Sequence, residues 1–227
     1  MQEISRLYGS GREQVVALNN VSTEINQGEF VAIMGPSGSG KTTFLSTVGG
    51  INPPTTGKVF VDGIECYCLS SEKLADFRRE HFGFVFQQLH LLPYLTAIQN
   101  VMLPLVISKQ RGLRWELALE SLAAVGLQDK PNRLPDQLSL GEQARVGIAR
   151  ALVNAPPILL ADEPTGNLDS KTGQDIMDLL NSLSKQDHTI IMVTHNAEAA
   201  GAAQRIIYIR DGQIVIKGQQ IDSNLKN

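Results

Sequence analysis

The stretch that decides the fold is "FVAIMGPSGSGKTT", residues 30–43. It opens with a continuous apolar run, 30–34, which is typical of a strand covered on both faces of a parallel sheet. The next residues fit the pattern of a glycine, four residues, Gly-Lys and then Ser or Thr. Apolar positions of a helix follow at Phe44, Leu45 and Val48. A glycine-rich loop between a buried strand and a helix start predicts a phosphate-binding site, because backbone N–H groups and the helix N-terminus attract anions.

We expect this loop to hold a nucleoside triphosphate with Mg²⁺. Lys41 would reach the outer phosphates, and the Thr42 hydroxyl would ligate the metal. The alternative is a Gly/Ser-rich turn that only precedes a lysine, and the strand–loop–helix context weakens it. The loop alone does not separate kinases, GTPases and motor ATPases. The residues expected to bind the nucleotide here are Gly35, Pro36, Ser37, Gly38, Ser39, Gly40, Lys41, Thr42 and Thr43.

Two further apolar runs, 157–161 and 189–194, have the same continuous character. Helical patterns lie between the three apolar runs. One pattern covers 114–127, before the second run, and the next has apolar positions from Ile176 to Leu183, before the third run. Strands that alternate with helices predict an α/β fold, here a P-loop NTPase core with a mostly parallel sheet. The first helical pattern places one apolar face on Trp115, Ala118, Leu119, Leu122 and Val125.

Two Asp-Gly pairs, at 62–63 and 211–212, lie between strand-like runs and predict hairpin turns. An antiparallel β subdomain should therefore accompany the parallel core. The stretch from about 70 to 135 reads as mostly helical and could form a lobe. We expect one domain over 1–227.

Composition narrows the class of protein. The chain is 42% hydrophobic and 19% charged with a formal net charge of −3, which argues against a large basic surface for nucleic acid. No apolar run approaches the roughly 20 residues that span a bilayer, and the N-terminus lacks a signal-peptide core. The cytosol is the expected location. Cys66 and Cys68 lack further metal ligands nearby, so we expect them to pack on one face of a strand.

Acidic residues and a histidine follow two of the buried runs. Asp162 and Glu163 follow one run, and His195 follows the next. The carboxyl ends of parallel strands form the ligand crevice of an open α/β sheet. Asp162 could hold Mg²⁺, Glu163 could polarise an attacking water, and His195 could sense the γ-phosphate. Solvated loop acids and a structural histidine are the alternative.

A helix start at 138–143, "LSLGEQ", combines Ser139 and Glu142 in a capping box. The apolar stripe continues at Val146, Ala149 and Val153. Capping alone would explain this stretch.

Together with the phosphate loop, Gln87, "LADEP" and His195, however, it resembles the ATP-binding cassette (ABC) ATPases, whose signature is usually written LSGGQ or LSGGE. In that family the capped helix faces ATP held by a second copy. The resemblance implies that Ser139, Gly141 and Glu142 contact ATP in trans, and that the helical lobe, about 70–135 plus the start of this helix, is the signature subdomain. It also implies that Gln87 links Mg²⁺ and water to a membrane partner, that Asp169 lies in the dimer loop and that Tyr8 stacks on adenine.

"FRREHFGFVFQQLHLLP" and "LADEPTGNLDS" look most like the ATP-binding subunits of lipoprotein-releasing and macrolide-efflux transporters. The resemblance implies an ATPase that dimerises around two ATP and powers a separate permease from the cytoplasmic face of the bacterial inner membrane. The permease contact is expected around 88–105. A soluble ABC switch, such as an iron–sulfur assembly ATPase, is one alternative. A P-loop kinase is another, but it leaves "LSLGEQ" unexplained.

Two features depart from the family pattern. Leu140 stands where the first signature glycine is usual, and its side chain could crowd the partner's nucleotide. Only "MQEISRL" precedes Tyr8, where the family has a complete strand, so the adenine contact depends on whether these residues form one.

Overall fold

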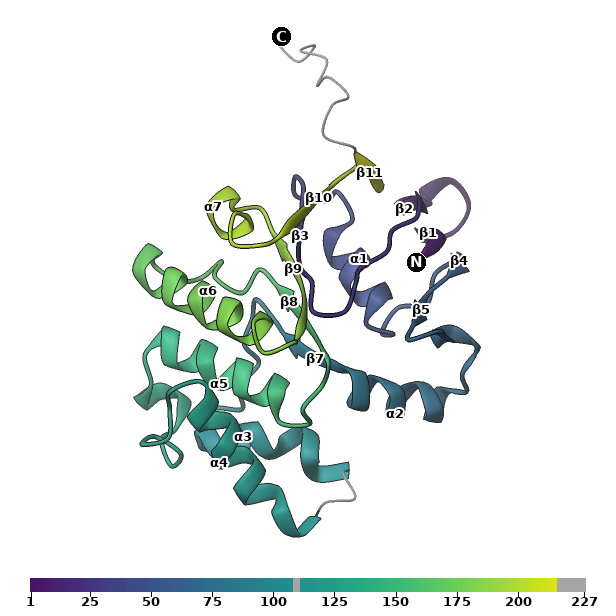
Figure 1. Cartoon of the computed structure of the whole chain (residues 1–227). Coiled ribbons are helices and arrows are strands. Elements are labelled where there is room, and N and C mark those ends of the chain that lie inside the picture. The colour runs from purple at the N-terminus through teal and green to yellow at the C-terminus, as the bar shows by residue number, and fades with distance from the viewer. Residues whose placement is uncertain (108–110, 216–227) are drawn as a thin grey trace.

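The computed structural model describes residues 1–107 and 111–215 (Figure 1). The strands are β1 (Gln2–Tyr8), β2 (Val15–Val21), β3 (Phe30–Met34), β4 (Thr56–Lys58), β5 (Phe60–Val61), β6 (Ile64–Glu65), β7 (Phe82–Val85), β8 (Ile158–Asp162), β9 (Thr189–Thr194), β10 (Arg205–Arg210) and β11 (Gln213–Val215). The α-helices are α1 (Lys41–Val48), α2 (Ser71–His81), α3 (Ala97–Met102), α4 (Arg114–Ala124), α5 (Leu140–Leu152), α6 (Ser170–Ser184) and α7 (Ala197–Ala200). Short 3-10 helices occupy Gly11–Glu13, Cys66–Cys68, Leu103–Ile107, Arg111–Leu113 and Pro135–Gln137.

The main sheet has the strand order β11-β10-β3-β9-β8-β7. Its pairs from β10 to β7 are parallel, and β11 is antiparallel to β10. The three apolar runs of the sequence become the neighbouring strands β3, β9 and β8, which confirms the α/β prediction. The predicted Asp-Gly turn at 211–212 also forms, with positive φ at both residues. In the sequence, the strand-like run after this turn covers 213–217, and residues 216–217 lie outside the described residues.

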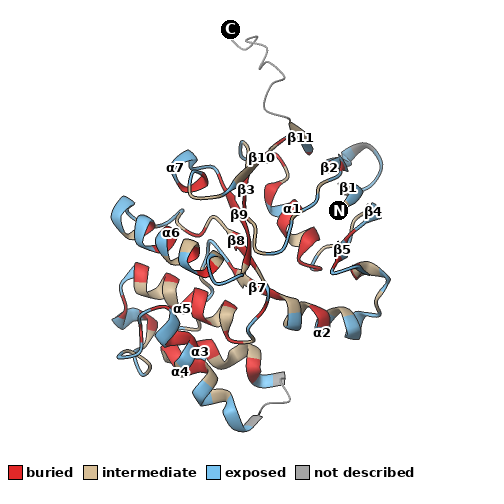
Figure 2. Ribbon diagram, in the orientation of Figure 1, coloured by how far each residue is buried: buried red, intermediate tan, exposed pale blue. Residues whose placement is uncertain are grey.

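The parallel strands bury both faces because alternate residues point to opposite sides. On β3, Phe30 and Ala32 join the core beneath α3–α6, whereas Val31 and Ile33 join the core that contains Phe44 of α1. Figure 2 shows the resulting pattern: the strands at the centre are mostly buried, and the helices around them have both buried and exposed residues. This two-faced burial explains why each run reads as continuously apolar rather than alternating.

A separate antiparallel sheet with the order β2-β1-β4 lies beside α1, near the hairpin of β5 and β6 (Figure 1). The predicted turn at 62–63 joins this hairpin, with positive φ at both residues. The residues before Tyr8 do form a strand: β1 runs from Gln2 and pairs with both β2 and β4. The concern about a missing strand is therefore not supported by the structure.

Two sequence-based interpretations were wrong. Cys66 and Cys68 lie in a 3-10 turn, not a strand; Cys66 is buried and Cys68 is exposed. Burial raises the pKa of the Cys66 thiol to about 11, which disfavours the reactive thiolate at neutral pH. Trp115 does not share the buried face of α4: it lies in the first turn of the helix and is 45% exposed, whereas Ala118 and Leu122 are buried.

The stretch 70–135 is less purely helical than its composition suggests. It contains α2, α3 and α4, but it also supplies β7, the edge strand of the main sheet. The helices α3, α4 and α5 pack together below that edge, while α2 lies apart from them (Figure 1). None of the helices in the described part of the chain combines the length and apolarity needed to cross a membrane.

Candidate functional site

The phosphate loop lies between the end of β3 and the start of α1. Gly40 precedes α1 with φ of 102°, a conformation that favours glycine, and no side chain caps the helix. A Cβ at Gly40 would collide with the carbonyl oxygen of Ala17 on β2. The first N–H groups of α1 are thus left for an anion. Lys41 donates to the carbonyl oxygens of Gly35 and Pro36, at 2.9 Å each, so its ammonium lies over the loop.

The two candidate metal ligands meet at the same place. The Thr42 hydroxyl donates to Oδ1 of Asp162 at 3.4 Å, which joins the start of α1 to the end of β8. Burial raises the pKa of the Asp162 carboxyl, and neighbouring Glu163 acts in the same direction. Hydroxyl and carboxylate oxygens are ligands that Mg²⁺ prefers, and a divalent cation would offset the unfavourable buried charge. These residues fit the metal of a nucleotide–Mg²⁺ complex.

Glu163 and His195 are in direct contact. Nδ1 of His195 lies 2.8 Å from Oε1 and 2.7 Å from Oε2 of Glu163. The pairing of β8 with β9 brings them together, and the Glu163 N–H donates to the Val193 carbonyl at 2.9 Å. Glu163 has φ of 49°, which is uncommon for a residue with a side chain and costs energy. The sequence prediction that both side chains lie at one sheet edge is confirmed in this geometry.

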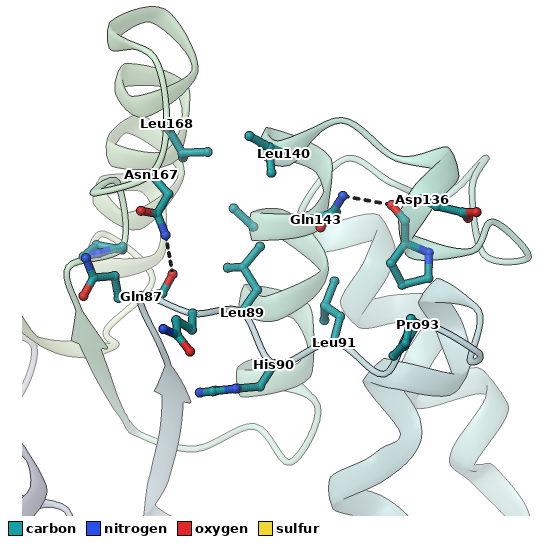
Figure 3. Close-up of a pocket in the computed structure, with 14 residues that line it drawn as sticks. Gln87, Leu89, His90, Leu91, Pro93, Asp136, Leu140, Gln143, Asn167 and Leu168 are labelled. Carbon is teal, nitrogen blue, oxygen red and sulfur yellow. Dashed lines mark hydrogen bonds between the residues drawn. The ribbon is translucent and has the colours of Figure 1, made fainter.

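Gln87 follows β7 and borders a groove of about 490 Å³ (Figure 3). The side-chain amide of Asn167 donates to the Gln87 carbonyl at 3.2 Å. Leu140, at the start of α5, faces Leu168 across this groove. Gln87 thus lies between the loop after Glu163 and the helix that begins at Ser139.

The start of α5 forms the predicted capping box. The Glu142 N–H donates to the Ser139 hydroxyl at 3.2 Å, and the Ser139 N–H donates to Oε2 of Glu142 at 3.0 Å. Lys130 also binds Glu142, and this hydrogen bond is the main reason that the pKa of Glu142 is lowered. Leu140 is 58% exposed. A Cβ at Gly141 would collide with the methyl group of Thr172 on α6, so α5 and α6 approach most closely with glycine here.

In residues 1–107 and 111–215, no hydrogen bond joins Ser139 or Glu142 to the phosphate loop. Among the described residues, Ser139 forms hydrogen bonds only within its own helical turn. Figure 1 shows α5 apart from the loop between β3 and α1 of the same chain.

The remaining predicted site residues are Asp169 and Tyr8. Asp169 caps α6: its Oδ1 accepts from the Thr172 N–H at 3.1 Å, and hydrogen bonding to Thr172 lowers the pKa of its carboxyl. Tyr8 ends β1 and pairs with Val15 on β2, the strand whose Ala17 touches Gly40. Its ring is 38% exposed, and the Arg6 guanidinium lies 4.7 Å from the ring centroid.

Sequence reasoning missed three contacts at this site. Asn167 binds the Gln87 backbone, Thr172 packs on Gly141, and Arg150 binds the segment after Gln87. The only sequence signal was an arginine beside the apolar stripe of α5. Across the described residues, no cluster of three or more His, Cys, Asp or Glu side chains forms a metal site.

A mostly parallel sheet, a phosphate loop and an acidic pair at the adjacent strand end define a P-loop nucleoside triphosphatase. The family profile described as "ABC transporter" matches residues 18–166. The chain belongs to the ABC transporter family and is an ABC ATPase cassette.

Known relatives span this chain almost completely. An uncharacterised ABC transporter ATP-binding protein of Methanocaldococcus jannaschii, MJ0796, is 48% identical over 94% of both chains. A macrolide export ATP-binding/permease protein, MacB, of Burkholderia pseudomallei is 48% identical over 95% of this chain and 33% of its own length. The chain thus spans about a third of that longer relative.

Among solved structures, a dimeric post-hydrolysis state of the MJ0796 cassette bound to ADP and phosphate superposes with a TM-score of 0.86. It is 47% identical and covers 95% of each chain.

Proposed function

We propose that this ATPase dimerises around two ATP molecules and powers a separate membrane permease, in export or in the release of lipoproteins or lipids. The observation that carries the proposal is the separation of two half-sites. The phosphate loop, Asp162 and Glu163 form one half, and the start of α5 forms the other, without a hydrogen bond between them in the described residues. Two copies related by a two-fold axis would bring each half-site to its complement.

The chemistry proposed for the first half-site follows from its contacts. The loop N–H groups and Lys41 would bind the phosphates, and Thr42, Asp162 and Gln87 would hold Mg²⁺. Bound Mg²⁺ would neutralise phosphate charge. Glu163 takes the proton of the attacking water, and His195 orients the Glu163 carboxylate through their hydrogen bond.

The second half-site supplies the N-terminus of α5 to the partner's γ-phosphate. The Ser139 hydroxyl and the N–H groups of Leu140 and Gly141 are the proposed donors. Glu142 fixes Ser139 through the capping box. Asp169 would lie at the dimer loop, and Tyr8 would stack on adenine. The dimeric structures of the related MJ0796 cassette support this arrangement.

A permease partner is supported by the macrolide export relatives, whose names combine ATP-binding and permease functions. Within the predicted contact 88–105, Ala97, Ile98, Val101 and Leu105 are buried in the core and cannot face a partner. Tyr94 is 73% exposed and remains available. Just before this segment, exposed Phe86 stacks on Phe84, with ring centroids 5.8 Å apart. We propose that these exposed aromatic side chains carry the permease contact, at the cytoplasmic face of the membrane.

Lys41→Ala tests the nucleotide half of the proposal. The Lys41 ammonium neutralises phosphate charge, so the variant should lose most ATP binding and phosphate release while its unliganded circular dichroism spectrum stays unchanged. Titration with a fluorescent ATP analogue and a phosphate-release assay measure both. Unchanged nucleotide affinity would contradict the phosphate-loop assignment.

The proteins that bind this ATPase distinguish the transport function from the soluble alternative. Coexpression with a permease of the macrolide-export type should yield a complex that Tyr94→Asp weakens, with the isolated ATPase rate preserved. A chain that stays separate from such a permease, but copurifies with iron–sulfur assembly components, would support the soluble alternative. Transfer of phosphate to a small acceptor instead of water would support a kinase.

A further inference from the structure

The segment after Gln87 is held from two sides. On one side, Asn167 donates to the Gln87 carbonyl. On the other, the Arg150 guanidinium donates to two successive carbonyl oxygens, that of Leu89 at 2.6 Å and that of His90 at 2.9 Å. His90 has φ of 47°, an uncommon backbone conformation for a residue with a side chain. These contacts fix where the chain runs immediately after Gln87.

Arg150 lies near the C-terminal end of α5, the helix that Ser139 begins. Within the described residues its guanidinium has no carboxylate at ion-pair distance, and burial lowers its pKa. A partly buried cation needs strong acceptors to offset lost hydration, and the planar guanidinium can bind two neighbouring carbonyl oxygens at once. The two backbone carbonyls are therefore the main compensation for the Arg150 charge.

The same segment packs on α5 one turn earlier. A Cβ at Gly147 would lie 3.7 Å from a methyl group of Leu89, so the Leu89 side chain lies directly over that glycine. Figure 3 shows Leu89 and His90 alongside α5, with Gln87 at the start of the same segment. Packing and hydrogen bonding together make this segment follow the position of α5.

We infer that Arg150 is a positioning residue for Gln87: it ties the segment after Gln87 to α5, so that displacement of α5 by a nucleotide at Ser139 moves Gln87 relative to the metal ligands. The inference rests on the proposed roles of Gln87 and Ser139. The Asn167 contact links the same segment to the loop after Glu163, so Gln87 is held between the two half-sites.

The test compares two arginines of α5. Arg150→Met removes the guanidinium but keeps an apolar stem. Arg145→Met is the matched control. Arg145 makes the same kind of contact, donating to the Val125 carbonyl at 3.0 Å, and within the described residues it has no hydrogen bond to the segment after Gln87. Arg150→Met should lower kcat for ATP roughly tenfold with the ATP dissociation constant within about twofold of wild type. Arg145→Met should leave kcat within about twofold, even if its melting temperature falls.

Hydrogen exchange supplies a readout that does not depend on turnover. Amides of 87–92 should exchange faster in Arg150→Met than in either the wild type or Arg145→Met. Arg150→Lys, which keeps the charge and can reach at least one carbonyl, should recover part of kcat. If Arg150→Met does not fold, Arg150→Gln decides the matter, since its amide is too short to reach both carbonyls and should show the same kcat loss.

Three results would overturn the inference: wild-type kcat in the folded Arg150 variants, equal kcat loss in Arg145→Met, or unchanged exchange at 87–92. Gln87→Ala separates this failure from failure of the proposed function. If Gln87→Ala lowers kcat and the Arg150 variants do not, only the positioning role is wrong. If Gln87→Ala keeps wild-type kcat, the proposed role of Gln87 itself is wrong.

Discussion

At Asp162, the surroundings disfavour the charged carboxylate. Burial raises its pKa, and Glu163 adds to this, whereas the Thr42 hydroxyl and the Lys41 ammonium act in the opposite direction. A carboxyl group whose pKa is higher in the folded than in the unfolded state binds its proton more tightly when folded. Its contribution to stability is therefore lost as the pH rises from the unfolded to the folded pKa. At neutral pH the ligand-free fold carries a charge that a bound cation would stabilise.

Asp162→Asn should separate stability from function. Asparagine keeps the shape and can still accept from Thr42, so the nucleotide-free melting temperature at neutral pH should rise by roughly 1–3 °C. This gain should shrink toward acid pH, near the ordinary aspartate pKa of about 4, where the wild-type carboxyl is also neutral. Mg²⁺-dependent hydrolysis should be lost. Calorimetry without nucleotide and a phosphate-release assay check both, and a lower melting temperature would mean that the carboxylate is structurally stabilising.

Residues of the site differ in how far the sequence predicts them. Asp162, Glu163 and His195 could be placed because parallel strands end at one edge and each residue follows an apolar run. Arg150 and Asn167 could not, since their partners are backbone carbonyls of a segment some 60 to 80 residues away in sequence. Such contacts leave no periodic or compositional signal. Cys66 was misplaced because a two-residue spacing suits a strand and a short 3-10 turn equally well.

At the scale of elements, the first turn of α5 both caps its own helix and packs against α6. The capping box of Ser139 and Glu142 satisfies N–H groups of its own helix, and Gly141 allows contact with Thr172 of α6. Leu140 is held with its side chain exposed rather than packed. The cap was predictable from four residues of sequence. The close approach at Gly141 was not, because it depends on how α5 meets α6.

Ser139→Arg distinguishes a cap from a ligand site. Loss of the cap should cost about 1 kcal/mol, or roughly 2–4 °C in melting temperature, and the bulk should abolish ATPase activity across a dimer. The matched control is Ser70→Arg, because Ser70 caps α2 in the same way, accepting from the Lys73 N–H, but has no proposed ligand. Ser70→Arg should lower the melting temperature and leave the ATPase activity unchanged. If Ser139→Arg behaves like Ser70→Arg, the start of α5 is only a helix cap.

Leu140→Gly removes side-chain bulk at the same turn, whereas Ser139→Arg adds it. If the first N–H groups of α5 approach the partner's phosphate, removal of the exposed side chain should raise ATP-dependent dimerisation or turnover modestly, by about twofold. Glycine also loosens the helix start by up to roughly 1 kcal/mol, which offsets part of the gain. Turnover and melting temperature should therefore move in opposite directions. A fall in both would mean that the Leu140 side chain stabilises the working arrangement.

For the whole molecule, the α/β class could be predicted because the three apolar runs are neighbouring strands at the centre of the sheet. The assignment of 70–135 as mostly helical missed the strand β7. Its four residues, "FGFV", lie between α2 and a long irregular segment and are too short for a period to emerge. Yet β7 determines where Gln87 lies, at the end of the edge strand beside β8. Gln87, Asp162 and His195 therefore lie at the carboxyl ends of three neighbouring parallel strands, β7, β8 and β9.

This arrangement predicts how the molecule should behave when hydrolysis is blocked. Glu163→Gln keeps a partner for His195 but cannot take a proton from water, so hydrolysis should slow by about 100-fold or more while ATP binding persists. Two copies should then stay together around ATP. Size-exclusion chromatography with Mg-ATP should show a dimer for Glu163→Gln and a monomer for Lys41→Ala/Glu163→Gln, which lacks the phosphate contact. Normal hydrolysis in the single variant would assign the proton transfer to another residue. A variant that binds ATP without hydrolysing it yet remains monomeric would mean that the two half-sites do not meet between copies of this chain.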